Sequence, residues 1–140
     1  NRNVHFLGQV TEKQKQKLLS HAWIMIQPSM VEGWGITVIE ANASGTPVIA
    51  SNVSGLRDSI VNNQTGVLVE PRNIDAFASA MNDFISDEKY RAEMSKAAHL
   101  WSENFSWDKS ADHFHNIMVN NMEKKYQYKL FRKIVLAKNK

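Results

Sequence analysis

The segment Ser29–Glu40, with the sequence SMVEGWGITVIE, constrains the fold more than any other part of this chain. An apolar run, Trp23 to Ile26, precedes it, and a largely apolar stretch, Ile36 to Ala43, forms its end and continues beyond it. Two glycines flank one aromatic residue at the junction, and glycine lets a backbone turn tightly and lets a ligand approach the main chain. We therefore expect a short buried strand, a tight turn and a buried helix in immediate succession.

The start of this helix is suited to an anion. The first amides of a helix have no partner inside it, and the helix dipole adds positive potential there. Glu32 lies just before the turn, and Glu40 lies about a turn into the helix, where a lone carboxylate among apolar neighbours needs a partner. Carboxylates accept hydrogen bonds from vicinal hydroxyls such as those of ribose. The spacing predicts a pocket for a ligand with phosphates and hydroxyls, and the alternative is a helix cap beside a surface glutamate.

Apolar runs alternate with helix-like segments along the chain. We expect strands at 4–7, 23–26, 47–50 and 67–69, and helices at 11–20, 36–43, 56–61, from 73 or 75 to about 85, at 88–100 and from 107 toward 122. Strands separated by helices and short turns are typical of a parallel sheet with right-handed crossovers. The predicted fold class is therefore α/β, a Rossmann-like parallel sheet flanked by helices.

Three of the expected helices have side chains whose direction can be predicted. The lysines of the first helix, Lys13, Lys15 and Lys17, are expected to form a solvated face. Apolar side chains are expected to face inward in the two others, namely Ile74, Phe77, Ala78, Met81, Phe84 and Ile85 in the helix after Asn73, and Phe114, Ile117, Met118 and Met122 in the helix after Ser106.

The central motif and the segments after it resemble a known family. The residues that carry the resemblance are Glu32-Gly33-Trp34-Gly35 through Glu40, then Ala41 and Gly45-Thr46-Pro47-Val48-Ile49-Ala50. They are similar to the donor-binding half of retaining glycosyltransferases of family 4, or group 1, and residues 55–71 also fit. The resemblance runs from about 3 to about 118. It implies the C-terminal half of a GT-B fold and transfer of a sugar from a UDP- or GDP-linked donor to a glycan or lipid-linked acceptor.

The resemblance also implies roles for single residues. Glu32 would contact the transferred sugar and support the transition state, as a nucleophile or as an electrostatic group. Amides and a helix dipole directed at the leaving diphosphate would stabilise the charge that develops there. No metal or other cofactor is expected. The implied donor-binding residues are Gly33, Trp34, Gly35, Ile36, Thr37, Val38 and Glu40, the last through the ribose hydroxyls, with Gly8, Gln9 and Val10 at the nucleobase.

Parts of such an enzyme have no match in this sequence. Relatives bring an Arg and a Lys to the diphosphate from a loop upstream of the first expected strand, and they have an N-terminal acceptor domain. We therefore expect a fragment that binds nucleotide weakly and transfers little or no sugar alone. The alternative function is a non-catalytic nucleotide- or sugar-binding module, or a subunit completed by another chain. A dinucleotide oxidoreductase is disfavoured because no G-x-G-x-x-G follows a strand.

Charge divides the chain into two parts. The net charge is +3, but residues 123–140 carry seven Lys or Arg and one Glu, so the remainder is mildly acidic. We expect a nucleotide-sugar-binding domain at 1–122 and a basic tail at 123–140. The tail is expected to pack on the missing domain, to lie on an anionic membrane through Leu130, Phe131, Ile134 and Val135, or to stay solvated.

The expected location follows from features that the sequence lacks. It contains no cysteine, no signal peptide and no apolar run of membrane-spanning length. We expect a cytoplasmic protein, or one peripheral on the inner membrane face. No nucleic-acid partner is expected.

Overall fold

The computed structural model describes the backbone of residues 3–138 and the side chains of residues 3–126. The chain divides into two compact units, Asn1–Asn104 and Phe105–Lys140, and each is described by itself. The predicted boundary between residues 122 and 123 falls inside a helix of the second unit, and the proposed division into a domain and a tail stays a prediction.

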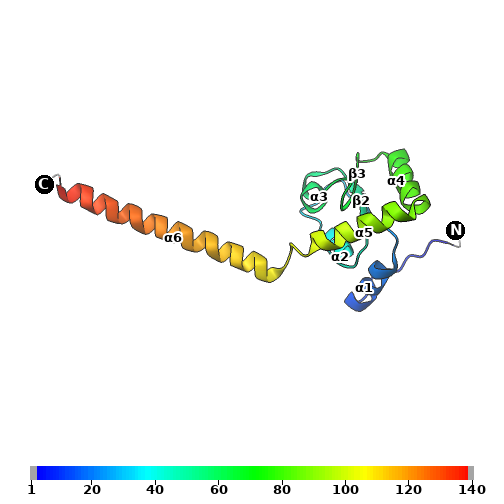
Figure 1. The fold of residues 1–140 in the computed structure, drawn as a ribbon, viewed down its shortest axis with the longest axis horizontal. Helices are drawn as coiled ribbons and strands as arrows, with labels where there is room; N and C mark the ends of the chain where they lie inside the picture. Colours follow the sequence, from blue (N-terminus) through cyan, green and yellow to red (C-terminus); the bar gives the residue numbers. More distant parts are fainter. Residues whose placement is uncertain (1–2, 139–140) are drawn as a thin grey trace. The chain divides into compact units, whose positions relative to one another are not determined.

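A three-stranded parallel sheet forms the centre of the first unit (Figure 1). Its strands lie in the order β1 (Met25–Gln27), β2 (Val48–Ser51) and β3 (Gly66–Val69). In the register of the sheet, Val48 pairs with Met25 on one side and with Gly66 on the other. The helices of this unit are α1 (Glu12–His21), α2 (Ile36–Ala43), α3 (Ser54–Ser59), α4 (Ile74–Ser86) and α5 (Glu88–Ser102). The predicted class, a parallel sheet flanked by helices, is confirmed.

Residues of β2 alternate between two hydrophobic clusters, as side chains on successive strand positions must. Val48 and Ala50 belong to the cluster that contains Val38 of α2 and Leu56 of α3. Ile49 belongs to the other cluster, which receives its largest buried side chain from α4. All four residues of β2 are buried, so this central strand is covered on both faces. Parallel sheets with helices on both faces produce this continuous apolar run.

The first helix, α1, begins with a complete capping box. The Thr11 hydroxyl accepts a hydrogen bond from the Gln14 amide at 3.3 Å, and the Gln14 side chain accepts one from the Thr11 amide at 2.9 Å. Two backbone donors that have no partner within the helix are thereby satisfied. The capping box fixes the first turn of the helix that carries Lys13, Lys15 and Lys17.

The predicted strand at 4–7 is wrong. Residues 4–7 have no strand conformation, and Phe6 is 97% exposed. The described part of the sheet ends at β1, which pairs with β2 alone, so no neighbouring strand satisfies the backbone of this apolar run. The strand expected at 23–26 exists but begins at Met25, because Trp23 is largely exposed and lies against the Arg91 guanidinium, 4.2 Å from its ring centre.

The predicted inward face of α4 is correct at only two of its six residues. Phe84 is buried and Phe77 packs against the same cluster, as expected. The helix is rotated relative to the prediction, so that Ala76 and Ala80 complete the buried face. Exposed residues of the predicted face are Ile74, Ala78, Met81 and Ile85.

The second unit contains one helix, α6 (Trp107–Lys138). The side chains predicted to face inward, Phe114, Ile117, Met118 and Met122, are exposed. The side chains named for membrane contact, Leu130 to Val135, lie outside the residues whose side chains are described. No helix in the described part of the chain is both long and apolar enough to cross a membrane.

Adjacent residues of α4 provide a test of this packing. Phe84 is 1% exposed and Ile85 is 54% exposed. Phe84→Ala leaves a cavity between sheet and helix, and we expect it to lower the free energy of unfolding by about 3–5 kcal/mol. Ile85→Ala should cost less than about 1 kcal/mol. Chemical denaturation of both variants gives the comparison, and equal losses would show that α4 packs as the sequence alone suggested.

Candidate functional site

The loop from Pro28 to Gly35 joins the carboxyl end of β1 to the start of α2, and it contains the central sequence motif. Gly35 is the N-cap residue of α2 and has a left-handed backbone with φ 78°. No side chain caps this helix. A Cβ at Gly35 would lie 2.7 Å from Cδ2 of Leu56, so conformation and packing both require glycine there. The first turn of α2 therefore presents backbone donors without a side-chain cap.

The first turn of α2 has an exposed side and a buried side. Ile36 and Thr37 are exposed, whereas Val38 is fully buried in the core. The Val38 amide also donates to the carbonyl oxygen of Gly35 at 2.9 Å. This geometry makes Val38 an anchor of the helix in the core, and its predicted contact with the diphosphate stays a prediction. It also corrects the expectation of a wholly buried helix, since α2 is buried only along Val38, Ala41 and Asn42.

Glu32 is held by a neutral partner from the end of β1. The Gln27 side-chain amide donates to Oε2 of Glu32 at 3.1 Å and to the Ser29 hydroxyl at 2.8 Å. Gln27 and Glu32 are both partly buried. Gln27 is not among the residues predicted from the sequence, although a polar residue ending an apolar strand beside a motif glutamate is a usable signal. The neutral Gln27 amide restricts the orientation of the Glu32 carboxylate and adds no positive charge beside it.

The backbone that carries Glu32 rests directly on α3. A Cβ at Gly55 would overlap the carbonyl oxygens of both Glu32 and Gly33. Gly55 is buried, and its neighbour Leu56 belongs to the core. The loop is thereby supported by the hydrophobic core through one close backbone approach.

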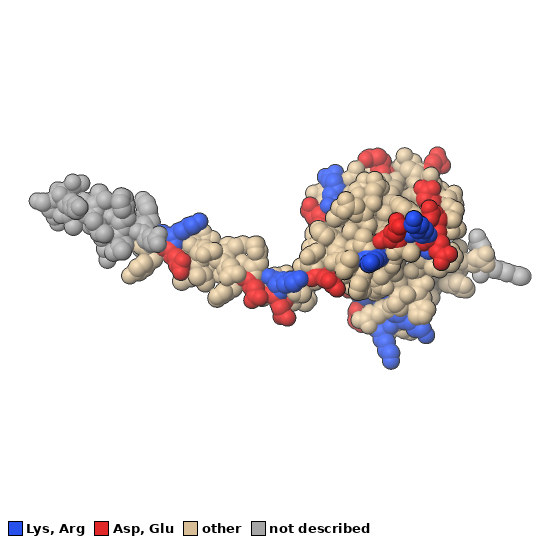
Figure 2. All heavy atoms as spheres, viewed as in Figure 1, with Lys and Arg blue, Asp and Glu red and all other residues tan. Residues whose placement is uncertain are grey.

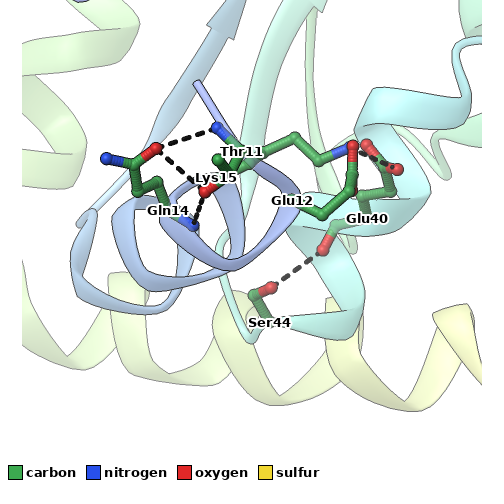
Figure 3. A network of polar contacts seen from close by, with 6 residues as sticks. All are labelled: Thr11, Glu12, Gln14, Lys15, Glu40 and Ser44. Carbon is green, nitrogen blue, oxygen red and sulfur yellow. Dashed lines mark hydrogen bonds and ion pairs between the residues drawn. The ribbon is translucent and has the colours of Figure 1, made fainter.

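Glu40 forms an ion pair with Lys15 (Figure 3). The Lys15 ammonium lies 2.8 Å from Oε1 of Glu40 and 2.9 Å from Oε2 of Glu12. The pair joins α1 to α2 across 25 positions of sequence. The expectation that Lys15 is solvated is therefore wrong, because the isolated carboxylate of α2 takes the nearest cation, while Lys13 and Lys17 are exposed as expected. The need for a partner at Glu40 was a signal in the sequence, but which cation meets it depends on how α1 packs beside α2.

The ion pair is intact at neutral pH. The hydrogen bond to Glu40, and then the one to Glu12, raises the pKa of the Lys15 ammonium above its ordinary value. A raised pKa for a cation means that the folded chain favours the charged form. The resulting stabilisation is complete below the ordinary pKa and is lost only as the pH rises through the raised one.

Two surface hollows flank α1. One, of about 690 Å³, lies between α1 and α2 and is lined by Lys15, Leu19, Glu40 and Ser44, among others. The other, of about 630 Å³, is lined by Val10, Leu7 and Gln14, among others. Basic side chains gather over α1 on the face shown in Figure 2.

The predicted nucleobase residues lie in the loop before α1. Gly8 has φ 62° and is exposed, as is Gln9, whereas Val10 is half-buried. Glu32 and Glu40 do not contact each other in any described hydrogen bond or ion pair, and each has its own partner. Among the predicted residues, Glu40 lines the first hollow and Val10 lines the second. Their roles in binding stay predictions.

Comparison with known proteins assigns the chain to a family. Residues 1–101 match the family described as glycosyl transferases group 1. The chain belongs to this family of glycosyltransferases. A D-inositol 3-phosphate glycosyltransferase from Streptomyces avermitilis is 36% identical over 108 residues, which are 77% of this chain and 23% of that protein. A relative of the same name from Corynebacterium aurimucosum is 33% identical over 121 residues, 86% of this chain and 29% of that protein. The chain therefore spans about a quarter of the length of these curated glycosyltransferases.

Solved structures confirm the GT-B fold of this group 1 chain. Sucrose-phosphate synthase (tll1590) from Thermosynechococcus elongatus superposes with a TM-score of 0.80 and 30% identity, covering 88% of this chain and 31% of that one. A TarM mutant from S. aureus, in complex with fondaparinux, alpha-GlcNAc-glycerol and UDP, superposes with a TM-score of 0.74 and 29% identity, covering 82% and 23%.

Two glycines of the group 1 motif region allow the support of the loop to be tested. Gly55→Ala forces a methyl group against the carbonyls of Glu32 and Gly33, and we expect it to lower the free energy of unfolding by about 1–3 kcal/mol. Gly33→Ala is the matched control, since a Cβ there meets nothing within 4 Å. Its effect should stay within about 0.5 kcal/mol. Urea denaturation measures both, and a Gly55→Ala chain as stable as the parent would contradict the close approach.

Proposed function

We propose that this chain is the donor-binding part of a retaining glycosyltransferase of family 4. The donor is a nucleoside diphosphate sugar linked to UDP or GDP, and the acceptor is a glycan or a lipid-linked sugar. Membership of the group 1 family supports the reaction class. The TarM structure, whose complex contains UDP, supports the donor class.

One observation carries this proposal. The start of α2 has no side-chain cap, it follows a parallel strand, and a carboxylate stands on each side of it in sequence. Open α/β sheets bind ligands outside the carboxyl ends of their strands. Backbone donors and the helix dipole suit a diphosphate, while Glu32 and Glu40 suit hydroxyl groups. No other helix start in the described residues combines these features with the family motif.

Each group would act on a different part of the donor. In the transfer, the bond between the anomeric carbon and the diphosphate oxygen breaks, and a bond to the acceptor oxygen forms. The first turn of α2, from Gly35 to Thr37, would stabilise the charge that grows on the leaving diphosphate. Glu32 would lie beside the sugar and support positive charge at the anomeric carbon. Glu40 would accept hydrogen bonds from the ribose hydroxyls.

A titration with UDP, GDP, ADP and their sugars tests this assignment. We expect one nucleotide to bind, and Glu40→Ala to weaken nucleotide and nucleotide sugar alike by roughly 10- to 100-fold, the loss of hydrogen bonds worth about 1.5–3 kcal/mol to a charged group. Glu32→Ala should weaken mainly the sugar-bearing ligands. Calorimetry on the longest natural polypeptide that contains these residues gives the affinities.

Glu88→Ala is the control, because it removes an exposed carboxylate from α5. It should leave all affinities unchanged. If no nucleotide binds at millimolar concentration, or if Glu40→Ala matches Glu88→Ala, the pocket does not bind a nucleotide-linked donor and the proposal fails.

A further inference from the structure

We propose that Lys15 is a positioning residue for ribose recognition, acting through Glu40. The inference rests on the proposed function, because it assigns a second residue to the same site. Lys15 would fix the Glu40 side chain so that one carboxylate oxygen stays available to the ribose hydroxyls. It would also offset the negative charge of that carboxylate near the diphosphate.

The two carboxylate oxygens of Glu40 have different surroundings. Oε1 receives the Lys15 ammonium at 2.8 Å, and the described residues supply no hydrogen-bond partner for Oε2. The Glu40 side chain is 34% exposed, so a ligand can approach it from solvent. A carboxylate that is hydrogen-bonded through one oxygen presents the other oxygen in a restricted direction. A hydroxyl donor then loses less side-chain entropy on binding.

Lys15 itself is held from two sides. Its ammonium contacts Oε2 of Glu12 as well as Oε1 of Glu40, and its side chain is only 29% exposed. The capping box of Thr11 and Gln14 fixes the turn of α1 from which it projects (Figure 3). On the other side, Glu40 precedes the fully buried Ala41. Both ends of the ion pair are thus attached to ordered backbone.

Lys15 could instead compete with the ribose for Glu40, and the change in affinity on removing Lys15 would then have the opposite sign. If the ion pair competed with ribose, the ligand would have to break it, and removing the ammonium would strengthen binding. If Lys15 positions Glu40, removing it weakens recognition of the ribose hydroxyls and leaves contacts to base and diphosphate unchanged. The preference for a ribonucleotide over its 2′,3′-dideoxy analogue separates the two cases, because only this ratio reports the hydroxyls.

The experiment measures this ratio by calorimetry on the longest natural polypeptide that contains these residues. The probes are whichever of UDP, GDP and ADP binds most tightly and its 2′,3′-dideoxy analogue. We expect Lys15→Met to lower the ratio by up to about fivefold, the upper end of the range for a surface ion pair. Lys15→Arg should restore most of it. Lys96→Met, which removes an exposed lysine from α5, should leave it unchanged.

A second pair of variants shows whether Lys15 acts through Glu40. Against a Glu40→Gln background, Lys15→Met should have no further effect on the ratio. An unchanged or higher ratio in Lys15→Met alone overturns this inference. If the parent protein shows no Glu40-dependent preference for the ribonucleotide, the proposed function fails and the role of Lys15 fails with it.

Discussion

The close backbone contact between Gly55 of α3 and the loop after β1 is the constraint on which the site depends. Side-chain contacts can adjust by rotation, but any side chain at a glycine pressed against two carbonyl groups must displace the backbone. Leu56, the next residue, lies fully buried in the same core cluster as Val38 of α2. One hydrophobic cluster thus holds both the loop that carries Glu32 and the helix that carries Glu40. The site requires no separate scaffold because the core itself sets its geometry.

Much of this arrangement could be predicted from the sequence, wherever a local pattern also matched its surroundings. The apolar run from Val48 to Ala50 became the central strand, since helices cover both of its faces. Gly35 was expected to permit a tight turn, and it has the left-handed backbone that such a turn requires. The helix expected from residue 11 does begin there, because Thr11 and Gln14, only three positions apart, cap its first turn.

The failures arose where the answer depended on residues distant in sequence. Phe6 belongs to an apolar run, but composition cannot supply the neighbouring strand that would bury it. The rotation of α4 was mispredicted because Ala80 takes a place in the core that larger side chains such as Met81 were expected to fill. The sequence showed that Glu40 needed a partner, yet it could not identify Lys15, which reaches the carboxylate from another helix.

The two motif carboxylates differ in the charge of their partners, and this difference suits their proposed roles. Glu32 is held by the neutral amide of Gln27, which adds no positive charge beside it. The carboxylate is thus suited to stabilise positive charge that develops at an anomeric carbon. Glu40 is paired with the ammonium of Lys15, which it shares with Glu12, so its negative charge is partly offset. A bare carboxylate beside a diphosphate would repel it, whereas a carboxylate with a cation beside it repels it less and still accepts hydrogen bonds from ribose. A single motif thereby provides two chemically distinct carboxylates because their partners come from different elements, a strand end and a separate helix.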